Sequence, residues 1–113
     1  MINKTIIKAL KPLSIPVYFA TRGENNNFPL VVFNVLENPK YYGNVEHKLT
    51  EYEVMLNLYV DKNKVFDLIK KVEDNMTANG FILGSKVSAI WDTNLNVFNQ
   101  PLEFKIWKDE GEE

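Results

Sequence analysis

The chain has one histidine and no cysteine, so few of its side chains are suited to catalysis or to metal binding. His47 stands between Glu46 and Lys48 in a polar stretch, where an imidazole could act as an acid, a base or a metal ligand. A zinc site needs three or four ligands, and no second histidine or any cysteine is present to help His47. We therefore interpret His47 as an exposed loop residue, and we expect no metal site and no cofactor.

Two glutamates are the other candidates for acid-base chemistry. Glu51 and Glu53 are two residues apart, which places both on the same face of a strand, as a pair of catalytic carboxylates would require. Strand alternation more often makes such a pair part of a solvated face. No serine stands in a glycine-rich elbow, and no glycine-rich loop that could hold a phosphate is present. The sequence thus predicts a protein that is not an enzyme.

Aromatic side chains suggest contacts with macromolecules. Tyr41 and Tyr42 follow Lys40 and could stack on bases or meet another protein. The 13 basic and 15 acidic residues leave a net charge of −2, so no overall positive field attracts nucleic acid. A protein contact is the preferred interpretation, and a small nucleic-acid-binding or regulatory domain is the alternative from a different class.

A strand followed directly by a helix is the clearest structural signal. From position 51 to 60 the apolar residues alternate, with Tyr52, Val54, Leu56, Leu58 and Val60 on one face. After Asp61 the apolar spacing changes to three and four, which predicts a helix whose buried stripe is Val65, Leu68, Ile69, Val72 and Met76. Asp61 or Asn63 can cap the start of this helix, and Gly80 can end it in the left-handed conformation.

The remaining elements follow from apolar runs and chain breakers. We expect a helix that presents Ile2, Ile6, Ile7 and Leu10 on one face and ends at Pro12. Strands are expected over 15–20 at a sheet edge, over 30–36, over 81–91 with an interruption near Gly84, and over 102–107. Loops are expected over 21–27, 37–48 and 92–100.

This order, helix, three strands, helix and two strands, predicts an α+β fold with a mainly antiparallel sheet of about five strands. A chain of 113 residues is expected to form a single domain, 1–113, with a frayed acidic tail at 109–113. No apolar run approaches the roughly 20 residues needed to span a bilayer, and the N-terminus has no signal-peptide pattern, so we expect no membrane association.

Several large side chains are predicted to face away from the core. Met55 and Tyr59 alternate with the buried set of the central strand, and Trp107 is out of phase with Leu102, Phe104 and Ile106. Two helices cannot easily cover both faces of a five-stranded sheet, so these side chains predict an association surface and hence an oligomer.

Most of the chain resembles a known family in the order and spacing of its elements. The segments concerned are Ile15-Pro16-Val17-Tyr18, then 28–33 (Phe-Pro-Leu-Val-Val-Phe), then 52–60 (Tyr-Glu-Val-Met-Leu-Asn-Leu-Tyr-Val), a helix, and Asn79-Gly80-Phe81. They resemble the tail completion, or tail terminator, proteins of long-tailed bacteriophages and prophages. The resemblance covers roughly the first 85 residues best. A composition rich in asparagine, lysine and isoleucine would suit a phage of a low-GC host.

The resemblance implies a structural virion protein that forms a ring, often a hexamer. Such a ring caps the finished tail tube, ends tube polymerisation and offers a docking face to the head connector. The implied partners are further copies of the chain, the tail tube protein and the head-tail connector protein. The implied location is the host cytoplasm during assembly and then the tail-neck junction of the virion. Another head-tail neck component is the alternative within the same biology.

The family supplies no catalytic residues, so contact residues are inferred from expected exposure. We expect protein interfaces in the polar loops and at the outward aromatic positions. The candidate residues are Arg22, Glu24, Tyr41, Tyr42, His47, Tyr59 and Trp107.

Overall fold

The structure is a computed structural model that describes residues 2–24, 27–41, 48–61 and 65–109, with positions 40, 41, 48, 65 and 109 described by their backbone alone. The elements are, in chain order, α1 (Ile2–Leu10), a 3-10 helix η1 (Lys11–Leu13), β1 (Val17–Phe19), β2 (Leu30–Tyr41), β3 (Lys48–Val60), α2 (Val65–Ala78), β4 (Ile82–Lys86), β5 (Ile90–Asp92) and β6 (Val97–Asp109). This confirms the predicted α+β class and element order, with β5 as an additional short strand.

The strands form one twisted sheet in the order β1-β2-β3-β6-β4, and β5 also pairs with β6. All neighbouring strands are antiparallel except β1 and β2, which are parallel. β1 lies at the edge, as expected from Pro16 just before it, and the Pro16 carbonyl accepts a hydrogen bond from the Val31 amide at 2.9 Å.

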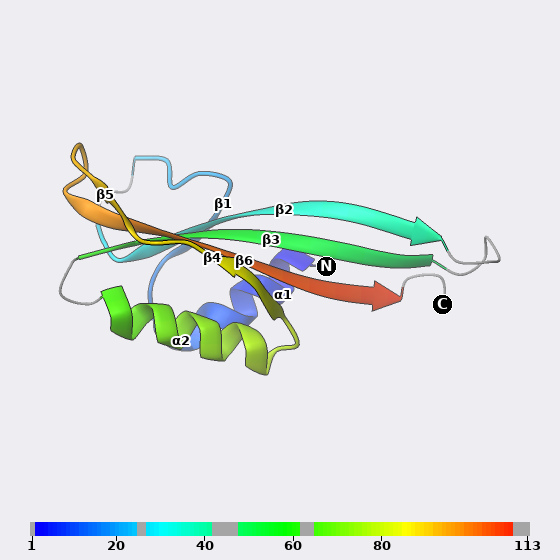
Figure 1. The fold of residues 1–113 in the computed structure, drawn as a ribbon. Coiled ribbons are helices and arrows are strands. Elements are labelled where there is room, and N and C mark those ends of the chain that lie inside the picture. Colours follow the sequence, from blue (N-terminus) through cyan, green and yellow to red (C-terminus); the bar gives the residue numbers. More distant parts are fainter. Residues whose placement is uncertain (1, 25–26, 42–47, 62–64, 110–113) are drawn as a thin grey trace.

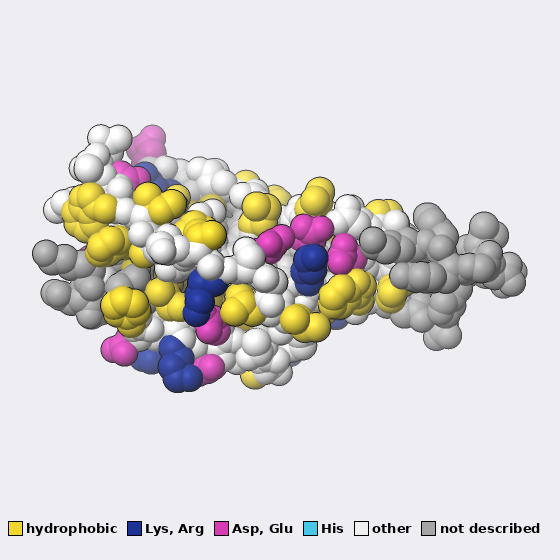
Figure 2. Space-filling view, viewed as in Figure 1, with side chains coloured by type: hydrophobic (Ala, Val, Ile, Leu, Met, Phe, Trp, Pro, Cys, Tyr) yellow, Lys and Arg dark blue, Asp and Glu magenta, His cyan; other side chains and the backbone are white. Residues whose placement is uncertain are grey.

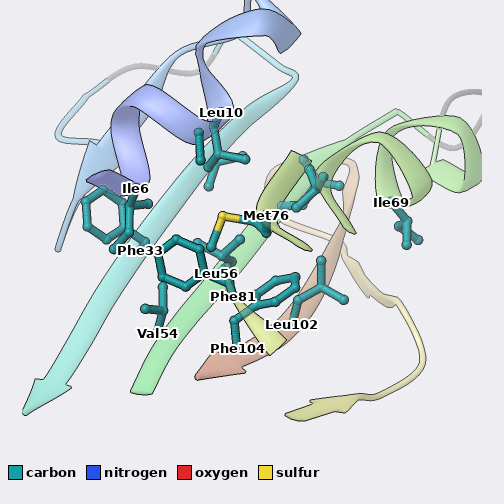
Figure 3. Close-up of a cluster of buried hydrophobic side chains, with 14 of the residues drawn as sticks. Ile6, Leu10, Phe33, Val54, Leu56, Ile69, Met76, Phe81, Leu102 and Phe104 are labelled. Atoms are coloured by element: carbon teal, nitrogen blue, oxygen red, sulfur yellow. The ribbon is translucent and has the colours of Figure 1, made fainter. Parts of the chain in front are cut away.

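Both helices pack on the same face of the sheet, so the body has two layers, and no helix of the described residues covers the opposite sheet face (Figure 1). The period-two prediction for the central strand is confirmed, because every second residue from Tyr52 to Val60 is buried. Figure 3 shows Val54 and Leu56 of this strand among side chains from α1, α2 and β6. Its labelled core residues are Ile6, Leu10, Phe33, Val54, Leu56, Ile69, Met76, Phe81, Leu102 and Phe104.

The end of α2 is also as predicted. Gly80 has φ +93°, and its amide donates to the Thr77 carbonyl at 3.1 Å. The Phe81 amide donates to the Met76 carbonyl at 3.1 Å, which completes the pair of reverse hydrogen bonds that closes many helices. Both Met76 and Phe81 are buried, so this turn is fixed by core packing as well as by hydrogen bonds.

The predicted loop over 37–48 is wrong at both of its ends. β2 continues to Tyr41 and β3 already begins at Lys48, with these two residues paired in register. Pro39 suggests a chain break, but β1 pairs only with Val31–Phe33. Beyond Phe33, the edge of β2 that faces away from β3 therefore has no neighbouring strand among the described residues. A proline is tolerated at such an edge because its missing N–H breaks no ladder bond there.

The end of β2, the start of β3 and the matching end of β6 form an arm that projects beyond the helices (Figure 1). The molecule measures 51 × 25 × 23 Å, and its Cα radius of gyration is 15.5 Å. A globular domain of this length would have a radius of gyration of about 13 Å. None of the described helices combines the length and apolarity needed to cross a membrane.

The predicted loop over 92–100 is wrong as well, because β6 begins at Val97. Only four residues connect β5 and β6, and the Asp92 carboxylate accepts hydrogen bonds from the Asn94 and Leu95 amides at 2.9 and 3.0 Å. Asn96 follows with φ +62°, a conformation that asparagine adopts more readily than most residues. The expected interruption near Gly84 is confirmed as a register shift between Leu83 and Ser85.

Candidate assembly surfaces

The sheet face without helices presents apolar and charged side chains in rows across the strands. One row is Asn38, Glu51 and Trp107; the next is Leu36, Glu53, Lys105 and Ile82; a third is Asn34, Met55, Glu103 and Ser85. We call this set the outer sheet face. Four of its large apolar side chains are 42–55% exposed: Leu36, Met55, Ile82 and Trp107. Figure 2 shows hydrophobic side chains interspersed with acidic and basic ones over the middle of the body.

The carboxylates of the outer sheet face are only partly paired. The Lys105 ammonium lies 4.0 Å from a Glu51 oxygen, and the Asn38 amide donates to Glu53 at 3.0 Å. Within the described residues, Glu103 has no ion-pair or hydrogen-bond partner on its side chain. Three carboxylates against one ammonium leave this face net negative.

A hollow of about 180 Å³ interrupts the outer sheet face between β3, β6 and the end of β4. Met55, Pro101 and Glu103 are among the residues that line it. β4 ends opposite Leu102 and β5 begins opposite Asn99, so Pro101 lies where neither strand pairs with β6. The hollow therefore results from the change of pairing partner along β6.

The loop between β1 and β2 covers part of the same sheet face near β3. The ring of Phe28 lies 6.2 Å from the ring of Tyr59, and the Arg22 guanidinium lies 5.9 Å from the Phe28 ring centre. Leu30 and Val32 point to this side and are buried, so β2 is covered on both faces at this end. Tyr59 faces outward as its phase predicts, but Phe28 packs on it and leaves it half-buried.

The residues predicted as interface candidates fall into separate regions. Arg22 and Tyr59 belong to the covered end of the sheet, and Glu24 is exposed in the adjacent loop. Trp107 lies on the outer sheet face towards the arm, directly across from Glu51. Tyr41 ends β2 and is described by its backbone alone, whereas Tyr42 and His47 lie outside the described residues.

A second hollow, on the helix side, was not predicted from the sequence. It has a volume of about 660 Å³ and lies between the first turn of α2 and the segment that joins β4 to β5. Phe66, which lines it, is 83% exposed. The sequence did contain a signal for this hollow, because Phe66 is a large apolar residue that falls outside the buried helical stripe of Leu68, Ile69, Val72 and Met76.

The exposed side of α1 is basic. Lys4, Lys8 and Lys11 are exposed, and in the described part of the chain none of them has a carboxylate partner. Ile7, expected on the buried face, is instead 45% exposed and stands beside Lys4 and Lys11. The helix buries Ile6, Ala9 and Leu10, and Ile7 lies on the flank of the helix between this buried stripe and the lysines.

Among the described residues, no group of three or more histidine, cysteine, aspartate or glutamate side chains could hold a metal ion. Glu51 and Glu53 lie on the open sheet face beside Lys105 and Asn38, whose side chains they contact. Such positions allow surface contacts with charged partners.

Comparison with known proteins gives a likeness of fold. The sequence matches no protein-family model and no curated protein sequence. Among solved structures, the chain is similar to the gp17 protein of bacteriophage SPP1, with a TM-score of 0.51 and 14% sequence identity. The match covers 98% of this chain and 91% of the phage protein. At this identity the likeness establishes a shared fold over nearly the whole of both chains.

Proposed function

We propose that this chain is a structural subunit at the head-tail junction of a long-tailed bacteriophage. It closes with further copies into a ring on the end of the tail tube, stops tube polymerisation and presents a docking face to the head connector. The observation that carries the proposal is the fold shared with a bacteriophage protein over nearly all of both chains. It agrees with the resemblance noted in the order and spacing of the sequence elements.

Two surface features support an assembling rather than a reacting protein. The outer sheet face carries exposed Leu36, Met55, Ile82 and Trp107 in neighbouring rows, and large exposed apolar patches often mark interaction sites. The arm of β2, β3 and β6 projects from the body and can reach a neighbouring subunit (Figure 1). A ring on a tube end would act by geometry, because it hides the surface to which the next tube subunit adds.

Deleting the gene from the producing phage tests this function. Without a terminator, we expect cell lysates to contain abnormally long tails without heads, because tube growth no longer stops. Tails of normal length that fail to join full heads would instead assign the chain to another component of the neck. Normal infectious particles would refute both assignments. Plasmid-borne expression of the chain should restore normal particles and is the control.

The same proposal places the subunit in the host cytoplasm during assembly and in the finished virion afterwards. Negative-stain microscopy of particles carrying an affinity-tagged copy locates it directly. We expect the tag at the junction of tail and head, and a tag at the far tail tip would contradict the assignment.

A further inference from the structure

The basic side of α1 has no counterpart elsewhere in the helix layer. On α2, Lys70 pairs with Asp74 at 3.3 Å, and Lys86 of β4 pairs with Glu73 at 2.8 Å. The other two charged side chains of α2, Lys71 and Asp67, carry opposite charges that cancel. Lys4, Lys8 and Lys11 therefore give the described helix layer its positive charge, concentrated on one side of α1.

The opposite side of the body carries the complementary charge. Glu53 and Glu103 of the outer sheet face are not within 4 Å of a described ammonium group. Glu103 of β6 pairs with Met55 of β3, and Met55 is two residues beyond Glu53 along β3. The Cα atoms of Glu53 and Glu103 are therefore about 8 Å apart. Lys4 and Lys8 are one turn apart, about 6 Å along the helix axis, and flexible lysine side chains bridge the difference.

The apolar parts of the two surfaces correspond as well. Ile7 projects beside Lys4 and Lys11, its neighbours three and four residues away, while exposed Met55 borders the hollow of about 180 Å³ beside Glu103. An isoleucine beside lysines on α1 thus complements a hollow beside the Glu103 carboxylate on the outer sheet face. Burial of Ile7 and Met55 against each other would remove two exposed apolar side chains from water.

We propose that α1 of one copy docks on the outer sheet face of the next copy, with Ile7 at the hollow beside Met55 and with Lys4 and Lys8 against Glu53 and Glu103. The inference deepens the proposed function, on which it rests, by naming the contact between ring neighbours. The occupant of the open sheet face is a second copy of this chain.

The position of the two surfaces determines the kind of assembly. α1 and the outer sheet face lie on opposite sides of the two-layer body, so one subunit uses both surfaces towards two different neighbours. Such a heterologous contact repeats from copy to copy and forms a closed ring when the rotation between neighbours divides a full turn. A helix of nine residues covers less than the roughly 800 Å² per partner of a standard interface, so each pairwise contact is weak and ring closure stabilises the set.

Charge reversal with mixing tests the pairing. Lys4→Glu/Lys8→Glu makes both surfaces of a subunit acidic, and Glu53→Lys/Glu103→Lys makes both basic. For the unaltered chain we expect sedimentation velocity at low salt to show concentration-dependent association. Each double variant alone should lose this association. An equimolar mixture should regain it, because the acidic α1 of one variant faces the basic sheet of the other. Lys70→Glu/Lys71→Glu on α2 is the control with the same change of net charge, and it should associate normally.

Disulfide trapping identifies the contact independently and captures weak association. The chain has no cysteine, so Ile7→Cys and Met55→Cys introduce the only thiols. Under mild oxidation of the mixed variants we expect 7–55 dimers to form at least tenfold faster than 7–7 or 55–55 dimers. Lys71→Cys, exposed on α2, is the control and should cross-link slowly with either. Equal rates, predominant 55–55 dimers or no cross-linking would overturn the proposal, as would failure of the charge mixture to associate.

Complementation of the gene deletion separates this inference from the proposed function. If the chain terminates tails, neither charge-reversed variant should restore normal particles alone, and co-expression of both should. Normal rescue by each variant alone would refute the α1-to-sheet contact and leave the terminator function standing. A deletion that produces normal particles would refute the function whatever the cross-linking shows.

Discussion

Glu103 of β6 stands directly across from Met55 of β3 on the sheet face that neither helix covers. Met55 is 52% exposed, while its neighbour Leu56 points to the opposite face and is 1% exposed. One step along the chain thus passes from solvent to the centre of the core, as the strand period requires. A side chain like Met55 contributes little to folding and is free to serve assembly.

Substitution at these two neighbouring positions should separate folding from assembly. Met55→Thr introduces a residue suited to strands and should change the free energy of unfolding by no more than about 0.5 kcal/mol. Leu56→Thr places a hydroxyl and a void among buried side chains and should cost about 3 kcal/mol. Urea denaturation followed by circular dichroism measures both changes, and similar losses would contradict the assignment of the two faces.

The turn after α2 should depend on backbone conformation at Gly80. Gly80→Ala is expected to lower the free energy of unfolding by about 1–2 kcal/mol, because φ +93° is unfavourable for a residue with a Cβ. Crowding is not the cause, since an added Cβ would lie 3.5 Å from the Ile106 side chain, an ordinary contact. Gly80→Asn is the matched variant and should lose less, because asparagine tolerates the left-handed region. Thermal unfolding of both variants checks the order, and a neutral Gly80→Ala would refute it.

Gln100 should fix the segment between β4 and β5. Its buried side-chain amide donates to the Val87 carbonyl at 2.6 Å and to the Pro101 carbonyl at 2.9 Å. Gln100→Met keeps the side-chain length and should cost about 1–2 kcal/mol through the lost hydrogen bonds. Gln100→Glu should cost more at neutral pH, because an ionised carboxylate would then face two carbonyl oxygens. Chemical denaturation measures both, and a Glu variant as stable as the Met variant would exclude this role.

Much of the fold was predictable because local patterns and core packing agree. Alternation over 51–60 and the later change to helical spacing identified β3 and α2, and Gly80 marked the end of the helix. Phase alone placed Met55, Tyr59 and Trp107 outward. It did not show that Phe28 packs on Tyr59, because that contact depends on where the chain between β1 and β2 lies.

Other features follow from the arrangement in space rather than from local sequence. Pro39 indicates a break only if β2 has a neighbour on both edges, and the short β1 leaves the second edge open. The turn from Asp92 to Asn96 has residues typical of a tight hairpin, but the predicted loop extended past it into Val97–Gln100, which belongs to β6. The proposed assembly surfaces combine α1 with β3 and β6, so their charges become complementary only in the folded chain.

Pro39 should protect the open edge of β2 from unwanted pairing. It lies opposite Thr50 on a stretch of β2 that β1 does not reach, and exposed edge strands readily pair with other chains. Pro39→Thr adds a donor and a residue suited to strands, so we expect concentration-dependent, salt-resistant aggregation without loss of unfolding free energy. Light scattering on a dilution series measures this effect. Pro39→Lys adds the same N–H with a charge and serves as the matched control, which should stay dispersed. If the threonine variant remains as soluble as the unaltered chain at millimolar concentration, the edge is protected by something other than Pro39.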